Sequence, residues 1–351
     1  MERPHSCDEF ACRASSSVGV VARWRRRMGL GYAVTRILDA CPGLSPGAVE
    51  KRLAYGSFAH LRDRVVYLEV PKAACTAMKM VLRDLYALTP LTLYPQMSRQ
   101  TKRGMFVHAR VNAPLPALTE LDDVAQRELL EDDDVLRFTV VRNPYTRFVS
   151  AWRDKVYLYE PTAEDVYLAV RGVAPDVGHK QPIQFPEFVA HVERTIGATT
   201  DPHWRRQVDL TYPDAIRYSH IGKTENLPAT VEMLYRRAGH EPPETMPRAN
   251  GAALLAGAAY TPTLAERVHG VYAQDFLAFD YDPEAWPCDS DAQTAVSLDR
   301  FVDEIIERNV IITHLYDERA RLAREYDDVY RFSLTRLKNT WRRMFEPHQR
   351  A

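Results

Sequence analysis

The sequence has few cysteines and no long apolar run. Its five cysteines show no Cys-x-x-Cys spacing and their number is odd, which argues against a disulfide framework or a zinc site and favours a reducing compartment. No segment approaches the roughly 20 apolar residues that a membrane-spanning helix needs. At the N-terminus acidic residues come first and arginines follow a short apolar patch, the wrong order for a secretory signal. We therefore expect a cytoplasmic protein.

An excess of charge of either sign is also absent. The formal net charge is −1 over 351 residues, so no global basic field would attract nucleic acid, and any basic site has to be local. The sequence contains no His-Glu-x-x-His motif and no aspartates at calcium-loop or magnesium-loop spacing. The Asp132–Asp134 run is interpreted as a solvated turn before a strand. We therefore expect no metal and no nucleic-acid partner.

Strands and helices alternate from residue 65 onward. The expected strands are 65–70, 136–141 and 216–222, and a helix is expected after each of them. Asn143 can cap the second helix, which has Pro144 at its first position. The third helix, near 228–238, ends at Gly239. This order predicts an α/β fold in which helices flank a central parallel sheet on both faces.

Three regions of the chain differ in character. Residues 1–60 show no strong period beyond a helix around 30–40 and predict a partly helical N-terminal extension. Residues 61–285 form the expected main domain. Residues 290–347 are charged, with apolar residues at helical spacing, and predict a C-terminal amphipathic helical extension. Such helices suit contact with an anionic membrane surface, pairing in a homodimer or packing on the core, and these three alternatives stay open.

The segment after the first strand has the outline of an anion-binding turn. The strand delivers to the start of a helix the backbone of Ala73, Ala74, Cys75 and Thr76. Unpaired N–H groups and the helix dipole favour an anion there, and small side chains let a phosphate oxygen approach the main chain. Lys72 adds a positive charge and the Thr76 hydroxyl another donor. An exposed Pro-Lys loop is the alternative for this motif taken alone.

A second basic stretch follows the 136–141 strand. Arg142 stands at the carboxyl end of that strand, and Arg147 and Ser150 share a helix face because they are three residues apart. An arginine fork with a hydroxyl at this edge of a sheet suits a phosphate monoester. Ion pairs between these arginines and Asp132–Asp134 are the alternative, since surface ion pairs are common.

Together the two stretches resemble the nucleotide-binding signatures of sulfotransferases that use 3′-phosphoadenosine 5′-phosphosulfate. In that family a Pro-Lys-x-x-x-Ser/Thr turn holds the 5′-phosphosulfate, and an Arg-x-Pro-x-x-Arg-x-x-Ser-Ala-Tyr/Trp segment holds the 3′-phosphate. The resemblance implies a P-loop-like sulfotransferase fold. It also implies donor contacts from the whole turn between Lys72 and Ala77 and from Arg142 and Ser150.

Further stretches resemble the carbohydrate sulfotransferase branch, which includes chondroitin and HNK-1 type enzymes. They are "SAWRDK" (150–155), "PHWRRQ" (202–207), "IGKTEN" (221–226) and "YAQDFLAFDY" (272–281). The likeness covers about 65–282 and implies transfer of a sulfuryl group to a hydroxyl of a polysaccharide or glycolipid. The chain differs in having no Golgi membrane anchor, few cysteines and a helical tail, which favours a bacterial-style cytoplasmic enzyme.

The resemblance also suggests catalytic roles. Lys72 is expected to neutralise charge on the leaving oxygen. An acceptor alcohol needs a base, and His108 lies between the two nucleotide motifs, where related heparan and chondroitin enzymes place a catalytic histidine. A buried histidine on an alternating strand is the other interpretation of His108. His203 is the rival base, and Glu225 is a weaker candidate whose simpler role is an ion pair with Lys223.

The acceptor site is the least defined. His203, Trp204 and Arg206 are expected to contact the acceptor, and Arg248 to reach the nucleotide. Two long segments with the character of loops, 157–187 and 240–262, are rich in Pro and Gly, and loops of that length commonly bind something. Arg205, His179 and Lys180 lie in or beside these loops and could supply basic charge for a uronic acid, although plain surface charge explains each of them singly.

Two competing functions remain. A P-loop kinase shares the strand-turn-helix but needs a Walker glycine pair and a magnesium aspartate, and both are missing from this sequence. A catalytically inactive nucleotide-binding or glycan-binding protein could keep the fold, but Lys72, Thr76, Arg142 and Ser150 are all present. The sequence therefore favours a sulfotransferase.

Overall fold

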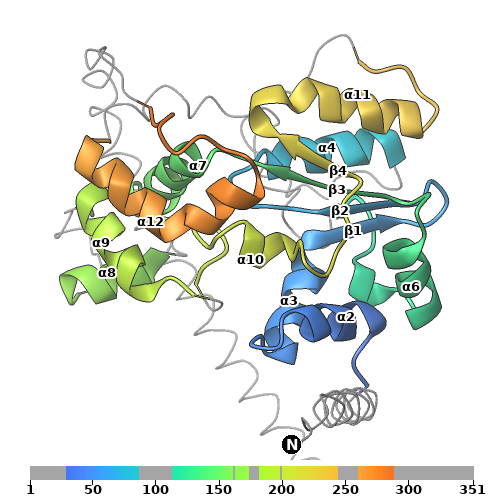
Figure 1. The fold of residues 1–351 in the computed structure, drawn as a ribbon, viewed down its shortest axis with the longest axis horizontal. Coiled ribbons are helices and arrows are strands. Elements are labelled where there is room, and N and C mark those ends of the chain that lie inside the picture. The colour runs from blue at the N-terminus through green and yellow to red at the C-terminus, as the bar shows by residue number, and fades with distance from the viewer. Residues whose placement is uncertain are drawn as a thin grey trace, which may run out of the picture. The chain divides into compact units, whose positions relative to one another are not determined.

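Four strands form one sheet in the part of the chain that the computed structural model describes, namely residues 29–86, 113–160, 163–173, 182–197, 200–243 and 260–287. Their order across the sheet is β1 (Ser57–His60), β2 (Val65–Leu68), β3 (Leu136–Val141) and β4 (His220–Lys223), as Figure 1 shows. β1 runs antiparallel to β2, whereas β2, β3 and β4 are parallel. The predicted central parallel sheet is confirmed, with one antiparallel edge strand.

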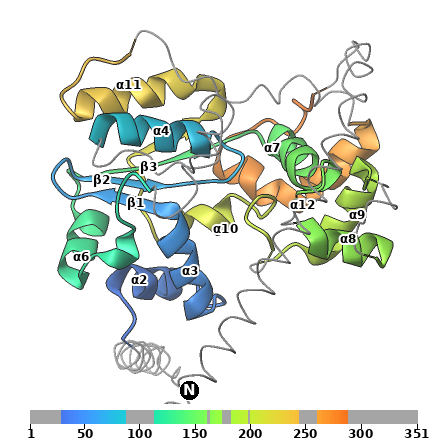
Figure 2. The ribbon, with the colours of Figure 1, turned by 180° about the vertical axis from the view of Figure 1, so that it is seen from behind.

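Helices cover both faces of the sheet (Figures 1 and 2). In β2, Val65 and Tyr67 pack toward α4 (Cys75–Tyr86) and α11 (Leu227–Arg237). The alternate residues, Val66 and Leu68, pack into the opposite core, which is formed with α2 (Tyr32–Ala40), α3 (Pro46–Gly56) and α6 (Asp123–Glu131). Successive side chains of a strand point to opposite faces, so a strand covered on both sides has to be apolar throughout.

Local signals fix several element boundaries. Asn143 Oδ1 accepts a hydrogen bond from the Tyr145 N–H over 2.9 Å at the start of α7 (Pro144–Ala151). Gly239, just beyond α11, has φ +75°, a left-handed conformation that favours glycine. The predicted cap and stop signal are therefore confirmed, as is the helix expected around 30–40, which is α2.

The predicted strand at 216–222 is shorter than expected. β4 begins only at His220, because the carbonyl of Arg217 accepts a hydrogen bond from the side chain of Arg137 over 2.6 Å rather than pairing in the ladder. Ile216 is buried in the core below the sheet. The apolar run therefore combines a buried turn with a short strand, which hydropathy alone does not separate.

The contacts of the chain divide it into two units. The first comprises residues 1–151 and 192–290 and contains the sheet, α7, α10 (Val208–Thr211) and α12 (Pro262–Ala278). α7 packs on α12 through aromatic rings, with the centroids of Tyr145 and Phe276 4.8 Å apart. Short 3₁₀ helices lie at Leu118–Glu120 and Thr224–Asn226.

The described part of the second unit is helical. It contains a π-helix (Trp152–Tyr157), α8 (Glu164–Arg171) and most of α9 (Phe185–Thr195). The expectation of a long loop over 157–187 is therefore wrong in part. α8 buries Val166 and Tyr167, and the Tyr167 hydroxyl donates to the carbonyl of Val156 over 2.8 Å. Flanking Pro and Gly residues hid this helix from the sequence pattern.

The expected extensions lie outside the described residues in large part. Residues 1–28 and 288–351 are not described, so the C-terminal helices and the division into three regions stay predictions. Among the described helices, none combines the length and the apolar character that spanning a membrane would require.

Candidate functional site

The turn after β2 has an unusual backbone. Lys72 has φ +67° and Ala74 has φ +56°, the left-handed region that side chains other than glycine enter at a cost of roughly 1–2 kcal/mol each. α4 begins at Cys75, directly after these residues. Alternating right-handed and left-handed residues can form an anion-binding nest, although in this turn the Ala73 N–H donates to the carbonyl of Val70 over 3.1 Å. Strain held at this position points to a binding function for the turn.

A buried ion pair lies under the turn. The Nζ of Lys79 on α4 is 2.6 Å from Oε2 of Glu69, and both side chains are only 2% exposed. Arg52 on α3 donates to the carbonyl of Glu69. The sequence analysis did not identify this pair. The signal for it was one charged residue at the end of an apolar strand and another within the apolar stripe of the following helix.

Arg142 lies beside this turn. Its Nη1 donates to the carbonyl of Lys72 over 3.3 Å and its Nε to the Thr146 hydroxyl over 3.0 Å. Burial lowers the pKa of the Arg142 guanidinium, which nonetheless stays charged. Because β2 and β3 are parallel neighbours, their carboxyl ends bring Lys72 and Arg142 together. The structure thus brings the two predicted donor-binding residues to the same edge of the sheet.

Arg147 has a different role from Arg142. Its buried guanidinium donates to three carbonyls, from Nε to Pro71 over 2.9 Å, from Nη1 to Arg205 over 2.7 Å and from Nη2 to Pro202 over 2.9 Å. Burial lowers the pKa of this guanidinium too. Arg147 therefore ties the turn to the 202–205 segment. Ser150, on the same helix, is almost completely buried.

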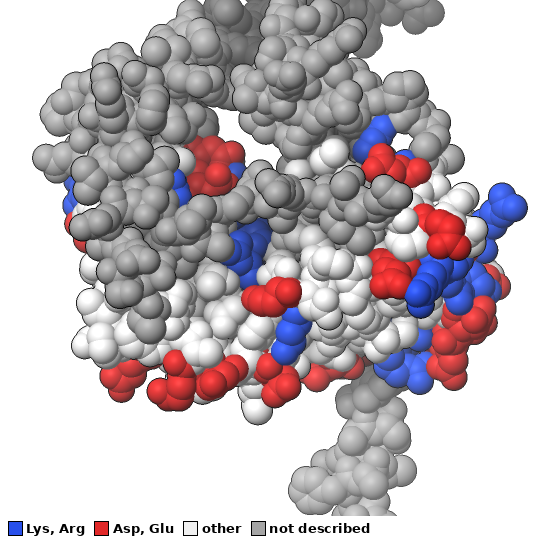
Figure 3. All heavy atoms as spheres, turned by 90° about the horizontal axis from the view of Figure 1, so that it is seen from above, with Lys and Arg blue, Asp and Glu red and all other residues white. Residues whose placement is uncertain are grey.

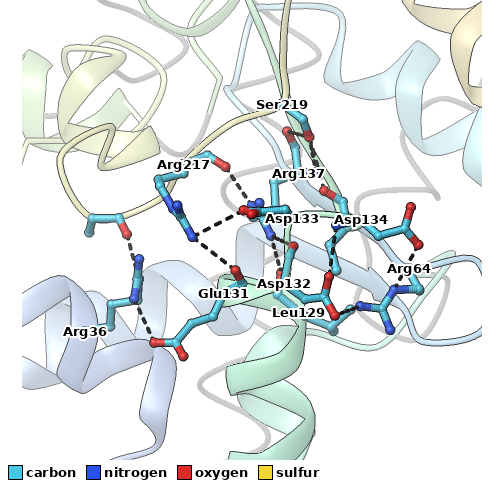
Figure 4. A network of polar contacts seen from close by, with 12 residues as sticks. Arg36, Arg64, Leu129, Glu131, Asp132, Asp133, Asp134, Arg137, Arg217 and Ser219 are labelled. Carbon is cyan, nitrogen blue, oxygen red and sulfur yellow. Dashed lines mark hydrogen bonds and ion pairs between the residues drawn. The ribbon is translucent and has the colours of Figure 1, made fainter.

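The Asp132–Asp134 run pairs with other arginines (Figure 4). Asp132 pairs with Arg64, Asp133 with Arg217 and Asp134 with Arg237. The guanidinium of Arg137 donates to the carbonyl of Asp132 over 2.7 Å. This network lies at the amino end of β3, the opposite end from Arg142. The alternative in which Arg142 and Arg147 pair with these aspartates is therefore wrong.

Glu225 supports the start of α7. Its Oε1 accepts the N–H of Asn143 over 3.1 Å, and its Oε2 accepts the Tyr281 hydroxyl over 3.1 Å. Burial and the nearby carboxylate raise the pKa of Tyr281. Lys223 donates instead to the carbonyl of Asp280 over 2.8 Å. The expected pairing of Glu225 with Lys223 is therefore replaced by separate contacts to the segment after α12.

The candidate acceptor residues lie on the segment that Arg147 holds. His203 Nδ1 is 2.7 Å from Oδ1 of Asp201, and both side chains are 28% exposed. Trp204 is buried, and Arg206 donates from Nε to the carbonyl of Val271 over 2.8 Å. Of these three, His203 has the contact best suited to chemistry, because a carboxylate on one ring nitrogen fixes the tautomer and leaves the other nitrogen to act.

Several predicted residues fall outside the described part of the chain. His108, Arg248, His179 and Lys180 are among them, and their roles stay predictions. Among the described residues, no group of three or more His, Cys, Asp or Glu side chains could hold a metal ion. Seen from above, the described surface carries basic and acidic side chains intermixed (Figure 3).

The comparison with protein families decides the assignment. Residues 57–282, well over half of the chain, match the model described as "Sulfotransferase family". The chain belongs to this family. The matched range includes the left-handed turn, Arg142, the 202–207 segment and Glu225.

Relatives of this chain include carbohydrate sulfotransferases. Carbohydrate sulfotransferase 8 of Homo sapiens is 28% identical over 256 residues, 67% of this chain and 57% of the relative. The Mus musculus protein is 31% identical over 51% of this chain and 42% of the relative. Carbohydrate sulfotransferase 10 of Homo sapiens is 27% identical over 57% of each chain. The chain spans about half the length of these relatives, and no solved structure matches it.

Proposed function

We propose that the protein transfers a sulfuryl group from 3′-phosphoadenosine 5′-phosphosulfate to a hydroxyl of a carbohydrate. The observation that carries the proposal is the contact between the Arg142 guanidinium and the Lys72 carbonyl, 3.3 Å apart at the carboxyl ends of neighbouring parallel strands. Ligands bind at this edge of open α/β sheets. The carbohydrate acceptor follows from the names of the relatives.

The residues present fit an anionic donor. The left-handed Lys72 and Ala74 shape a nest for the 5′-phosphosulfate, and the first turn of α4, from Cys75 to Ala77, adds backbone N–H groups. Ala73 and Ala74 carry no bulk that would keep an oxygen from the main chain. Arg142 and Ser150 are proposed to hold the 3′-phosphate. A P-loop-like architecture suits this arrangement.

The bound donor supplies an activated sulfuryl group, and the protein has to orient it and manage charge and one proton. Lys72 stabilises the negative charge that develops on the leaving phosphate oxygen. A histidine accepts the proton of the acceptor hydroxyl, with His108 as our first choice and His203, held by Asp201, as the alternative. Holding both reactants in line lowers the barrier without covalent catalysis by the protein.

For the acceptor and the cellular location of the reaction, the proposal gives classes rather than individual molecules. The acceptor is a polysaccharide or a lipid-linked glycan that contacts the segment from His203 to Arg206, and Arg248 reaches the nucleotide. No metal takes part. We propose a cytoplasmic enzyme whose C-terminal helices contact an anionic membrane surface or a second copy of the chain.

A transfer assay with labelled donor over a panel of polysaccharides and glycolipids tests this function. The wild type is compared with Arg142→Ala, His108→Ala and a control, Arg236→Ala, on the exposed face of α11. We expect Arg142→Ala to weaken donor binding and His108→Ala to slow turnover with the donor still bound. Full activity of His108→Ala moves the base to His203.

Other outcomes would contradict the proposal. Magnesium-dependent ATP binding without affinity for adenosine 3′,5′-bisphosphate would favour a kinase. Tight binding of the bisphosphate with no transfer to any acceptor would favour a catalytically inactive binding protein.

A further inference from the structure

The side chain of Gln207 forms two hydrogen bonds with the backbone of Arg142. Oε1 of Gln207 accepts the N–H of Arg142 over 2.9 Å, and Nε2 of the same side chain donates to the Arg142 carbonyl over 2.9 Å. Gln207 is completely buried. Its carboxamide therefore binds the N–H and the carbonyl of Arg142 as the backbone of a neighbouring strand would. These two hydrogen bonds fix the backbone between the end of β3 and the start of α7.

A second buried group fixes the glutamine. The carboxylate of Asp275 on α12 accepts the N–H of Gln207 over 2.8 Å and the N–H of Val208 over 2.9 Å. Asp275 is completely buried as well. A continuous path of short contacts thus runs from α12 through the start of α10 to the backbone of Arg142, and it is distinct from the contacts of Arg147.

The side chain of Arg142 is held separately by Thr146. The Thr146 hydroxyl accepts from Nε of Arg142 over 3.0 Å and donates to the Asn143 carbonyl over 3.2 Å. The guanidinium also donates to the carbonyl of Lys72. The Thr146 hydroxyl on α7 and the Lys72 carbonyl therefore set the orientation of the Arg142 guanidinium plane.

We propose that Gln207 and Thr146 are positioning residues for recognition of the 3′-phosphate, acting through the backbone and the side chain of Arg142. The inference rests on the proposed function, because it takes Arg142 as the 3′-phosphate ligand. A planar guanidinium binds phosphate through paired hydrogen bonds, so its affinity depends on orientation. A displacement of about 1 Å reduces the effect of a positioned group by as much as 10²-fold.

The chain offers a matched control for the glutamine. Gln126 is also buried and also bridges backbone groups, accepting the N–H of Ala33 over 2.8 Å and donating to the carbonyl of Leu121 over 2.7 Å. It belongs to α6, in the packing of α2 and α6 below the sheet. Its replacement removes the same chemical group from a place without contact to Arg142.

Calorimetry on the full chain measures Kd for adenosine 3′,5′-bisphosphate and for adenosine 5′-phosphate, which lacks the 3′-phosphate. The ratio of the two constants reports the 3′-phosphate alone. We expect Gln207→Leu and Thr146→Val each to lower the preference for the bisphosphate by about 10-fold or more, within the range for a charge-assisted hydrogen bond. Gln126→Leu should lower the melting temperature and leave the ratio unchanged.

The outcomes separate two kinds of failure. If the wild type shows no preference for the bisphosphate, the proposed function fails and this inference fails with it. If Arg142→Ala abolishes the preference while Gln207→Leu and Thr146→Val keep it within about twofold, the function stands and the positioning role is wrong. Thr146→Val keeps the test decisive if Gln207→Leu does not fold, because its side chain is isosteric and only partly buried.

Discussion

Arg147 donates a hydrogen bond from Nε to the carbonyl of Pro71 over 2.9 Å, joining residues 76 positions apart in the chain. Pro71 immediately precedes the left-handed Lys72, and the other nitrogens of the same guanidinium bind the carbonyls of Pro202 and Arg205. One buried side chain thus fixes the turn after β2 and the segment that carries His203. The second arginine of the signature is a structural clamp in this chain, whereas the first is the residue proposed to bind the 3′-phosphate.

Replacing Arg147 by lysine should lower the free energy of unfolding by about 3 kcal/mol. An ammonium group cannot reproduce the planar fork, so buried carbonyls lose their donors, and each such loss costs about 1–3 kcal/mol. Urea denaturation measures the change. The control is Arg236→Lys, whose side chain is 72% exposed and pairs with Glu232 on the same helix. Equal stability of the two variants would contradict the clamp.

Lys72→Met should affect turnover more than donor affinity. The charge of Lys72 is needed where negative charge grows in the transition state, so its loss should reduce kcat by about 10²-fold to 10³-fold, as for other positioned electrostatic groups. Affinity for adenosine 3′,5′-bisphosphate should fall much less, because the backbone of the turn remains. Steady-state kinetics and calorimetry distinguish the two effects, with Lys51→Met on the exposed side of α3 as control. An unchanged kcat would remove Lys72 from the mechanism.

Because the backbone of Ala74 is left-handed, a smaller and a larger residue at this position should have opposite effects on stability. Ala74→Gly relieves the strain of φ +56° and should leave stability unchanged or raise it by up to about 1 kcal/mol. Ala74→Val places a β-branched side chain in the same conformation and should weaken both stability and donor binding. Thermal unfolding with and without the bisphosphate measures this. Tolerance of valine at full affinity would show that the turn need not keep this conformation.

The buried Glu69–Lys79 ion pair should make the stability of the fold sensitive to the loss of one of its two charges. Glu69→Gln leaves a buried ammonium without its counter-charge and should destabilise the fold by about 3–5 kcal/mol. Glu69→Leu combined with Lys79→Met removes both charges and should recover most of that loss, since an apolar pair of similar volume is often neutral. A double-mutant cycle of Glu69→Leu, Lys79→Met and their combination, measured by urea denaturation, gives the coupling. Additive effects of the two single changes would contradict a direct pair.

Periodicity and local signals predicted the sheet, its flanking helices and the boundaries at Asn143 and Gly239. The resemblance to the sulfotransferase signatures also implied that Lys72 and Arg142 lie together. Other features depend on contacts distant in sequence, which local patterns do not contain. The strain at Lys72 and Ala74, the commitment of Arg147 to carbonyls and the bridge from Asp275 through Gln207 are of this kind. Residue type and spacing placed Arg142 and Arg147 in one basic stretch, and only the packing of α7 shows that their contacts differ.

Asp275 should make stability depend on pH in an unusual direction. Burial raises its pKa from 3.8 to about 6, although the N–H groups of Gln207 and Val208 and the charge of Arg147 act in the opposite sense. A carboxyl with a raised folded-state pKa stabilises the fold in its protonated form, so this contribution is full below about pH 4 and is lost as pH rises through about 6. At about 1.4 kcal/mol per pKa unit, the loss is on the order of 2–3 kcal/mol.

Urea denaturation between pH 4 and pH 7 compares the wild type with Asp275→Asn. Asparagine cannot accept both N–H groups, so the variant should be less stable at every pH, but its stability should fall less between these limits. Asp209, whose pKa burial also raises, adds a slope of the same sign that both proteins share. The slope rather than the level is therefore the test. Equal slopes would mean that Asp275 is ionised throughout this pH range, because its two backbone hydrogen bonds outweigh the effect of burial on its pKa. The carboxylate that binds the backbone of Gln207 would then carry a full negative charge at both neutral and acidic pH.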